Sequence, residues 1–366
     1  MKDSKHQRAL DDSFSSTISD RSMLTTSKDS TKEKRFEDRL TKGFFMGKIF
    51  VTRRIPSVGI DRLLAEHEVE LWPGQDPPTR DCLIEKVRGC SGVLSMLSDK
   101  IDAEVMQAAG STLRGIANFA VGYNNIDLAA AKDRNIQVGN TPGVLTSATA
   151  DIAVGLILAA GRCFGPAIHN VERLEWRNWE PMMFLGQEFE GKTLGIVGMG
   201  RIGFAVAKRL HGGWGMRTLY TARHAKPDAE STLNAIRVEL DDLLRQSDVV
   251  SLHCPLTPET RNLIGARELG LMKPNAILVN TARGEVIDQV ALAHALLQRR
   301  IFAAGLDVTT PEPIDPNDPL RLQDNCLILP HIGSATEDAR NQMATMAAEN
   351  LISAINGNPM PFGVNQ

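Results

Sequence analysis

Cysteines, long apolar runs and an excess of either charge are all scarce in this 366-residue sequence. The five cysteines are scattered without a CxxC pair, which argues against a structural zinc site or a disulfide framework. No apolar run approaches the roughly 20 residues that a membrane-spanning helix needs. The net charge is only −3, so no basic field attracts nucleic acid or anionic lipid. We therefore expect a cytoplasmic protein with reduced thiols and no metal, nucleic-acid or membrane partner.

The length and composition are those of a globular chain. Hydrophobic residues make up 42% and charged residues 23% of the sequence, as in ordinary folded proteins. A chain of this length is expected to form about two domains. Residues 1–45 differ from the rest, because they are rich in Ser, Thr, Lys and Asp and poor in apolar residues. We predict that they form a disordered tail. A second hypothesis is that the natural chain starts at Met46, which directly precedes the first strand pattern.

Two regions show alternating strand and helix patterns. In the first, predicted strands at 48–51, 68–71, 92–96, 113–118 and 136–138 are separated by helical patterns such as 58–66, 80–88 and 102–109. In the second, a helix at 146–160 precedes six predicted strands at 193–197, 217–220, 248–253, 276–280, 303–308 and 326–329. Such alternation predicts parallel sheets with helices on both faces, and six strands suit a doubly wound dinucleotide-binding sheet. A final helix is predicted at 335–355, ending near Gly357.

The strongest local motif is a glycine-rich turn directly after the first strand of the second region. Gly198, Gly200 and Gly203 form a G-x-G-x-x-G pattern that a helical run follows. In that setting the first glycine permits a tight turn, the second lets the backbone approach a pyrophosphate, and the third lets helix and strand pack closely. The N-terminus of the helix then offers free N–H groups to the anion. The motif therefore predicts a nicotinamide dinucleotide site.

The end of the next strand bears on the choice of cofactor. An NAD site places an acid about 20 residues after the glycines, but this chain has Thr221 and Arg223 there, with Lys226 close behind. A guanidinium can bind a 2′-phosphate that a carboxylate would repel. One charge-assisted hydrogen bond is worth about 1.5–3 kcal/mol, or roughly a ten- to hundredfold preference. We expect NADP(H) to be preferred and NAD(H) to be possible. The alternative is that Arg223 is a solvated surface charge.

Three further segments follow predicted strands and present chemically active side chains. They carry Arg283, then Asp307 and Glu312, and then His331. The carboxyl ends of parallel strands line the ligand crevice of such a sheet. An arginine can bind the carboxylate of a 2-oxo acid, a histidine can donate a proton, and a glutamate can orient the imidazole. A lone histidine is more often structural, and we assign no role to the other seven, His253 included.

Together these motifs resemble the D-isomer-specific 2-hydroxyacid dehydrogenase family, most closely its glyoxylate/hydroxypyruvate reductase branch. The resemblance covers residues 46–364 and is carried by segments 118–127, 140–146, 195–203, 280–284, 305–313 and 330–335. It implies a Rossmann-type cofactor domain at 146–335 and a smaller, discontinuous, flavodoxin-like substrate domain at 46–145 and 336–366. It also implies a homodimer. Segment 176–186, with Trp179, Met182 and Met183, resembles the loop that approaches the partner's site in such reductases; the alternative is an apolar patch covered within its own subunit.

The resemblance also implies roles for individual residues. Arg283, Glu312 and His331 would be catalytic. The substrate carboxylate would be held by Leu97, Ser98, Val121, Gly122 and Arg283. The cofactor would contact the three glycines together with Arg201, Ile202, Thr221, Arg223, Pro255, Thr260, Thr281, Ala282, Asp307, His331 and Gly333, with Asp307 at the nicotinamide carboxamide.

The expected activity is the NADPH-dependent reduction of glyoxylate to glycolate and of hydroxypyruvate to D-glycerate, with His331 as the general acid. Two alternatives stay open. One is another D-2-hydroxyacid dehydrogenase or a phosphite dehydrogenase, because the same arginine and histidine can serve those substrates. The other is a nucleotide-sensing, corepressor-like binding protein, because a fold does not settle a function.

Overall fold

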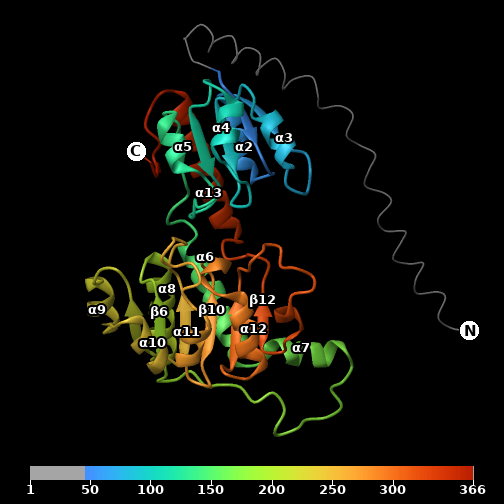
Figure 1. Cartoon of the computed structure of the whole chain (residues 1–366), viewed down its shortest axis with the longest axis vertical. Coiled ribbons are helices and arrows are strands. Elements are labelled where there is room, and N and C mark those ends of the chain that lie inside the picture. Colours follow the sequence, from blue (N-terminus) through green and yellow to red (C-terminus); the bar gives the residue numbers. More distant parts are fainter. Residues whose placement is uncertain (1–45, 366) are drawn as a thin grey trace, which may run out of the picture. The chain divides into compact units, whose positions relative to one another are not determined.

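The computed structural model describes residues 46–365, which form an α/β structure with two parallel sheets (Figure 1). The tail predicted at residues 1–45 lies outside the described residues. The first sheet is built from residues 48–139 and the second from residues 193–328. Both sheets confirm the predicted fold class.

The first sheet has the strand order β2-β1-β3-β4-β5, with every neighbouring pair parallel. This is the flavodoxin-like order. The strands are β1 (Lys48–Val51), β2 (Glu68–Leu71), β3 (Gly92–Ser95), β4 (Gly115–Asn118) and β5 (Gln137–Gly139). Helices α2 (Ser57–Leu64), α3 (Arg80–Lys86), α4 (Ala103–Ala109) and α5 (Leu128–Asp133) connect them. The predicted strand bounds agree with these to within two residues.

The second sheet has the order β12-β11-β10-β9-β6-β7-β8, also parallel throughout. Its strands are β6 (Thr193–Val197), β7 (Arg217–Thr221), β8 (Ile236–Arg237), β9 (Val249–Leu252), β10 (Ile277–Asn280), β11 (Ala303–Leu306) and β12 (Cys326–Ile328). Because β6 lies between β7 and β9, the strand order reverses beside β6, which is where doubly wound sheets bind ligands. The prediction of six strands was one short. The missed strand, β8, has two exposed residues and therefore no buried apolar run to mark it.

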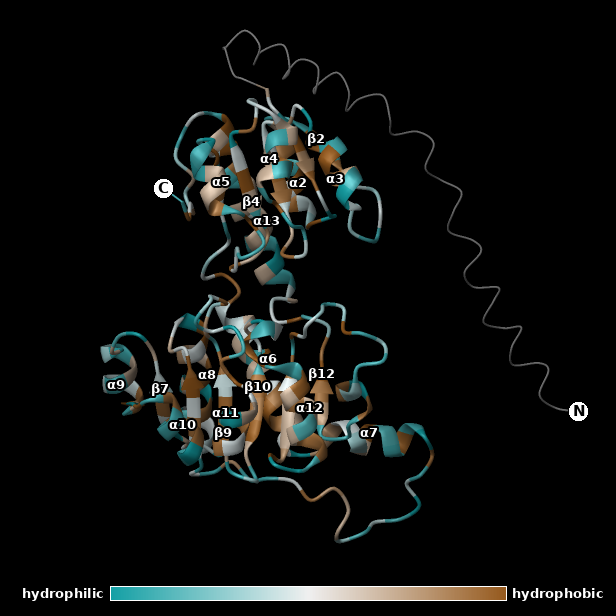
Figure 2. Cartoon of the chain, viewed as in Figure 1, coloured by the Kyte–Doolittle hydropathy of each residue, from teal (hydrophilic) through white to brown (hydrophobic). Residues whose placement is uncertain are grey.

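Apolar helices cover both faces of the second sheet. One core cluster includes residues of α10 (Leu240–Gln246), α11 (Ala266–Leu271) and α12 (Gln289–Leu297). The other includes residues of α6 (Thr146–Gly161), α8 (Arg201–Trp214) and α9 (Pro227–Leu233). Apolar colouring concentrates on the strands between them (Figure 2). Within residues 46–365 no single helix is long and apolar enough to cross a membrane. Only α6 joined to α7 (Phe164–Glu172), bent by 68°, has the length and composition, and α6 packs against β10 and β11.

The last helix, α13 (Glu337–Ile355), returns the chain to the first sheet. It packs against α2, β3, β4 and β5, and its alanines allow a close approach. A Cβ added at Gly59 would lie 2.7 Å from the carbonyl oxygen of Ala344. Gly357, at φ +78°, directly follows the helix C-cap, as a left-handed glycine commonly does. Beyond it, Gly363 forms an antiparallel bridge with Gly139.

Candidate active site

A cavity of about 630 Å³ opens at the carboxyl ends of strands from both sheets. Most of the site residues predicted from the sequence line it. These are Leu97, Val121, Gly122, Gly200, Arg201, Ile202, Arg223, Pro255, Thr281, Ala282, Arg283, Asp307, His331 and Gly333. The loops that follow the strands therefore bring residues from distant parts of the sequence to one place.

The glycine-rich turn joins β6 to α8. Gly198 has φ +97°, and an added Cβ would lie 2.7 Å from the backbone nitrogen of Cys254. An added Cβ at Gly203 would lie 2.4 Å from the carbonyl oxygen of Gly198, so the helix and the turn need glycine at both positions. Gly200 is the N-cap of α8 and lines the cavity, with no other atom within 4 Å of an added Cβ. The backbone at Gly200 and the free N–H groups of the first turn of α8 fit a pyrophosphate.

Arg223 lies just beyond the end of β7, exposed and on the cavity wall. Arg237 holds this turn, because its guanidinium donates to the carbonyl oxygens of Ala222 (3.1 Å) and Arg223 (3.2 Å). A hydrogen bond from Thr257 and, more weakly, the charge of Arg223 lower the pKa of Glu259. The turn thus presents the Arg223 guanidinium where an NAD-specific site would present a carboxylate.

Asn280, fully buried at the end of β10, shapes the loop that carries Arg283. Its side-chain oxygen accepts the Ala282 N–H at 2.9 Å, and its amide donates to the Arg283 carbonyl at 2.8 Å. The Arg283 guanidinium donates to the Ala282 carbonyl at 2.7 Å and to Asn124 Oδ1 at 3.2 Å. Burial lowers the pKa of Arg283, but a guanidinium stays cationic in proteins. A fixed positive charge therefore faces the cavity.

His331 and Glu312 form a pair next to that charge. His331 Nδ1 lies 2.7 Å from Glu312 Oε2, and Glu312 Oε1 accepts the Thr309 N–H at 3.2 Å. Within residues 46–365, His331 Nε2 makes no hydrogen bond. The glutamate thus fixes the orientation of the imidazole and leaves its second nitrogen able to exchange a proton.

Asp307 holds the backbone on which His331 sits. Its carboxylate, which is 1% exposed, accepts the N–H groups of Ile332 (2.7 Å) and Gly333 (2.8 Å). Burial raises the pKa of Asp307, while the two N–H groups and His331 oppose that rise. His331 itself has φ +54°, a conformation uncommon for residues other than glycine. The contact of Asp307 with a nicotinamide carboxamide stays a prediction.

Six of the predicted site residues do not line the cavity. They are Ser98, Gly198, Gly203, Thr221, Thr260 and Glu312. Thr221 ends β7 and accepts the Gly198 N–H at 3.0 Å through its carbonyl oxygen. The Thr260 hydroxyl donates to the Pro255 carbonyl at 2.7 Å and accepts the Thr257 N–H at 2.8 Å, so it shapes the loop in which Pro255 and Thr257 face the cavity.

Among the residues of the cavity wall that the sequence analysis did not predict, two carry ionisable side chains that bear on the site: His253 and Arg340. His253, to which we assigned no role, directly follows β9, and its Nε2 lies 2.8 Å from Ser251 Oγ. Burial lowers its pKa to about 3, so the imidazole is neutral near pH 7. Arg340, in the first turns of α13, stacks 5.8 Å from the centre of the Phe119 ring. The position of His253 after a strand was an available signal, whereas Arg340 lies on a helix and had none.

The sheet order, the glycine turn and the Arg283, Glu312 and His331 constellation define an NAD(P)-dependent oxidoreductase. A family model described as "D-isomer specific 2-hydroxyacid dehydrogenase, NAD binding domain" matches residues 154–333. The glyoxylate reductase of Korarchaeum cryptofilum is 49% identical over 320 residues, which are 87% of this chain and 96% of that protein. The chain belongs to the D-isomer-specific 2-hydroxyacid dehydrogenase family, which confirms the resemblance seen in the sequence.

Solved structures of other proteins have a similar fold. A protein from Thermus thermophilus has a TM-score of 0.81 and 45% identity, with coverage of 87% of this chain and 99% of that chain. The NADPH-dependent glyoxylate/hydroxypyruvate reductase of Sinorhizobium meliloti, solved with NADP and malonate, has a TM-score of 0.75 and 30% identity, with coverage of 87% and 97%.

Proposed function

We propose that this protein is an NADPH-preferring reductase of small 2-oxo acids that converts glyoxylate to glycolate and hydroxypyruvate to D-glycerate. The observation that carries the proposal is the His331–Glu312 pair, 2.7 Å apart, on the same cavity as the Arg283 guanidinium. Relatives named glyoxylate reductase, 49% and 48% identical, support this choice of substrate.

The site residues have separate tasks in this reaction. Arg283 binds the carboxylate and polarises the 2-oxo group through its fixed charge. The nicotinamide supplies the hydride when it is bound. His331 donates its Nε2 proton to the carbonyl oxygen as that oxygen gains charge, and Glu312 stabilises the imidazolium that exists before the transfer. One hydride and one proton convert the carbonyl into the alcohol.

Backbone donors support carboxylate binding at the other wall of the cavity. The N–H groups of Leu97, Ser98, Val121 and Gly122 donate to no partner within the described residues. Leu97, Val121 and Gly122 line the cavity, and an added Cβ at Gly122 would overlap the Arg283 guanidinium. Three of these donors and Arg283 thus line one cavity, which supports a shared role in binding the carboxylate of a 2-oxo acid.

The direct test is a steady-state assay at 340 nm with NADPH or NADH against glyoxylate, hydroxypyruvate, pyruvate and 2-oxoisocaproate. We expect the highest kcat/KM with NADPH and glyoxylate or hydroxypyruvate. Tight NADPH binding without turnover of any of the four would contradict the proposal.

The preference for NADP(H) rests on Arg223 and on the absence of an acid at that turn. Arg223→Asp is expected to raise KM for NADPH by about ten- to a hundredfold, since it replaces a charge-assisted bond with repulsion of the 2′-phosphate. KM for NADH should stay equal or fall. Lys226→Asp makes the same change of charge three residues further on, at a residue that does not line the cavity. Equal effects of Arg223→Asp on both cofactors would refute the assignment.

The packing of two helices supports a division into two domains. We propose that residues 46–145 and 336–366 form the substrate domain and that residues 146–335 form the cofactor domain. Support comes from α13, which packs on the first sheet, and from α6, which packs on the second sheet.

We propose a homodimer, and its support is an apolar surface formed by α7 and the segment that follows it. Leu174 is 89% exposed, Trp179 76% and Met182 75%. Phe164, Ile168, Val171, Trp176 and Leu185 are exposed as well. Sedimentation velocity should give twice the mass of the chain, and Leu174→Asp with Trp179→Asp should give the monomer. Leu297→Asp, a similarly exposed apolar position on α12, should leave the dimer intact. A monomeric wild type would contradict this proposal.

A further inference from the structure

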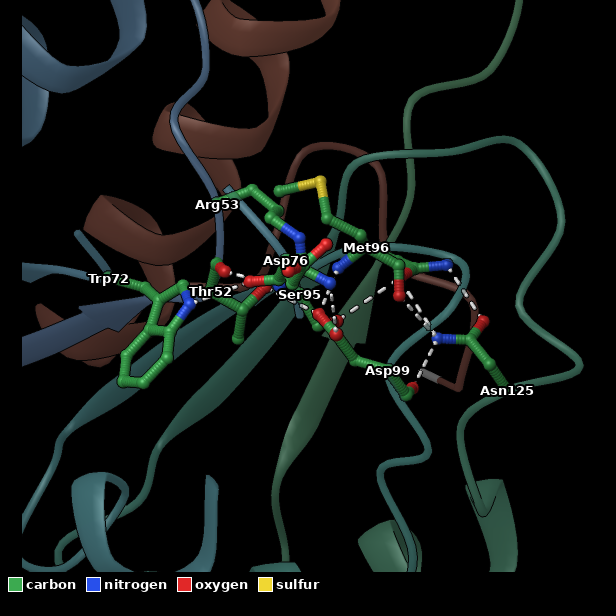
Figure 3. Close-up of polar contacts among 9 residues, drawn as sticks. Thr52, Arg53, Trp72, Asp76, Ser95, Met96, Asp99 and Asn125 are labelled. Carbon is green, nitrogen blue, oxygen red and sulfur yellow. Dashed lines mark hydrogen bonds and ion pairs between the residues drawn. The ribbon is translucent and has the colours of Figure 1, made fainter. Parts of the chain in front are cut away.

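The four free backbone N–H groups lie on two loops that belong to different strands. Leu97 and Ser98 follow β3, whereas Val121 and Gly122 follow β4. A carboxylate is held more tightly by both loops when their spacing is fixed before the substrate arrives, because ordering a loop on binding costs binding energy. Hydrogen bonds of Asn125 and Asp99, drawn in Figure 3, provide such a constraint.

Asn125 joins the two loops through one side-chain amide. Its Nδ2 lies 3.0 Å from the carbonyl oxygens of both Met96 and Asp99, at either end of the β3 loop (Figure 3). Asn125 also pairs with Asn118, whose Nδ2 donates to Asn125 Oδ1 at 3.0 Å. The same Asn118 amide donates to the Gly122 carbonyl at 2.8 Å. Two asparagines therefore hold carbonyl groups of both loops while the adjacent N–H groups stay free.

The Asp99 side chain also stabilises the β3 loop, through contacts with Met96, Thr52 and Arg53. Its carboxylate, which is almost fully buried, accepts the Met96 N–H at 2.7 Å and the Thr52 hydroxyl. Arg53 lies 3.5 Å from the second carboxylate oxygen and supplies the opposite charge. A buried carboxylate with these partners is costly to disturb, so the loop has one favoured conformation.

We propose that Asn125, supported by Asn118 and Asp99, is a positioning residue for the substrate carboxylate. It sets the distance between the β3 and β4 loops, so that the N–H groups of Leu97, Ser98, Val121 and Gly122 converge on one anion. It touches neither substrate nor cofactor. This inference rests on the proposed function for the identity of the substrate. Within that function it assigns Asn125, Asn118 and Asp99 the task of fixing the two loops that bind the substrate carboxylate.

The test compares Asn125→Ala with Asn325→Ala. Asn325 is a matched control, because its amide also bridges two backbone carbonyls, those of Leu296 (3.2 Å) and Phe302 (3.1 Å), away from the active-site cavity. Asn125→Ala is expected to raise KM for glyoxylate about tenfold with kcat within about twofold, since binding common to the ground and transition states is lost. The Kd of oxamate, an inert carboxylate of similar size, should rise equally, while the Kd of NADPH stays unchanged. Asn325→Ala should affect only the melting temperature.

Asp99→Asn provides a second variant that keeps the shape of the side chain if Asn125→Ala does not fold. It should also raise KM and the oxamate Kd. The proposal is wrong if folded variants keep the KM and oxamate Kd of the wild type, or if kcat alone falls. If the wild type fails to reduce glyoxylate, the proposed function is wrong. Oxamate binding to the enzyme–NADPH complex still tests the positioning role of Asn125 in that case.

Discussion

Replacing His331 with alanine is expected to lower kcat for glyoxylate reduction by about 10²–10⁴-fold, the usual contribution of a positioned general acid. The reason is that, of the two histidines that the described residues place on the cavity wall, only His331 pairs with a carboxylate. The other, His253, is neutral near pH 7. NADPH binding should change little, because the glycine turn and Arg223 are untouched. Steady-state kinetics and a fluorescence titration of NADPH measure the two quantities.

His294→Ala is the matched control for this variant, since His294 is exposed on α12, away from the cavity. It should leave both kcat and NADPH binding at wild-type values. Glu312→Gln should produce a smaller loss than His331→Ala, because it removes the charge opposite Nδ1 but keeps the proton donor. Unchanged turnover in His331→Ala would remove this residue from the mechanism.

Arg283→Ala is expected to lower kcat/KM for glyoxylate by about 10²–10⁴-fold. It removes about two charge-assisted hydrogen bonds to the substrate, each worth about 1.5–3 kcal/mol. Arg283→Lys should recover only part of the loss, because an ammonium keeps the charge but cannot bind a carboxylate through two parallel bonds. Both KM and kcat should change, since the same group binds substrate and polarises its carbonyl.

Arg88→Ala removes an equal charge at an exposed position near the end of α3, outside the cavity, and should match the wild type. A wild-type kcat/KM in Arg283→Lys would show that charge alone is needed, and a wild-type value in Arg283→Ala would contradict the assignment.

The fold was predictable wherever a buried apolar run had clear ends. Strands β1 and β6, which are almost wholly buried, were predicted to the residue, because turn residues and polar residues bound their apolar runs. The edge strand β8 could not be found, because pairing with β7 rather than burial defines it. The final helix was predicted from its spacing, but its place against the first sheet came only from the resemblance, since periodicity does not say which sheet a helix covers.

The candidate site was predictable to the extent that its residues follow strands. Arg283, Asp307 and His331 were all singled out by that rule, and they line one cavity. His253 obeys the same rule and was passed over, because a lone histidine carries no motif. Asn280 bonds backbone groups of its own loop, whereas Asn125 donates to backbone carbonyls of the β3 loop. Such roles depend on loop conformation and leave no pattern in the spacing of residues.

The position of α13 near the end of the sequence has a consequence for folding during synthesis. The apolar face formed by Ile49, Leu94 and Ala117 is covered by Met343, Ala344 and Leu351. These helix residues leave the ribosome roughly 200 residues after the last strand of that sheet. At a synthesis rate of about 5–20 residues per second, this apolar face is complete roughly 10–40 s before the helix residues that cover it are made. The first sheet therefore completes its core only when the last helix has been made, and this apolar face stays uncovered by α13 until then.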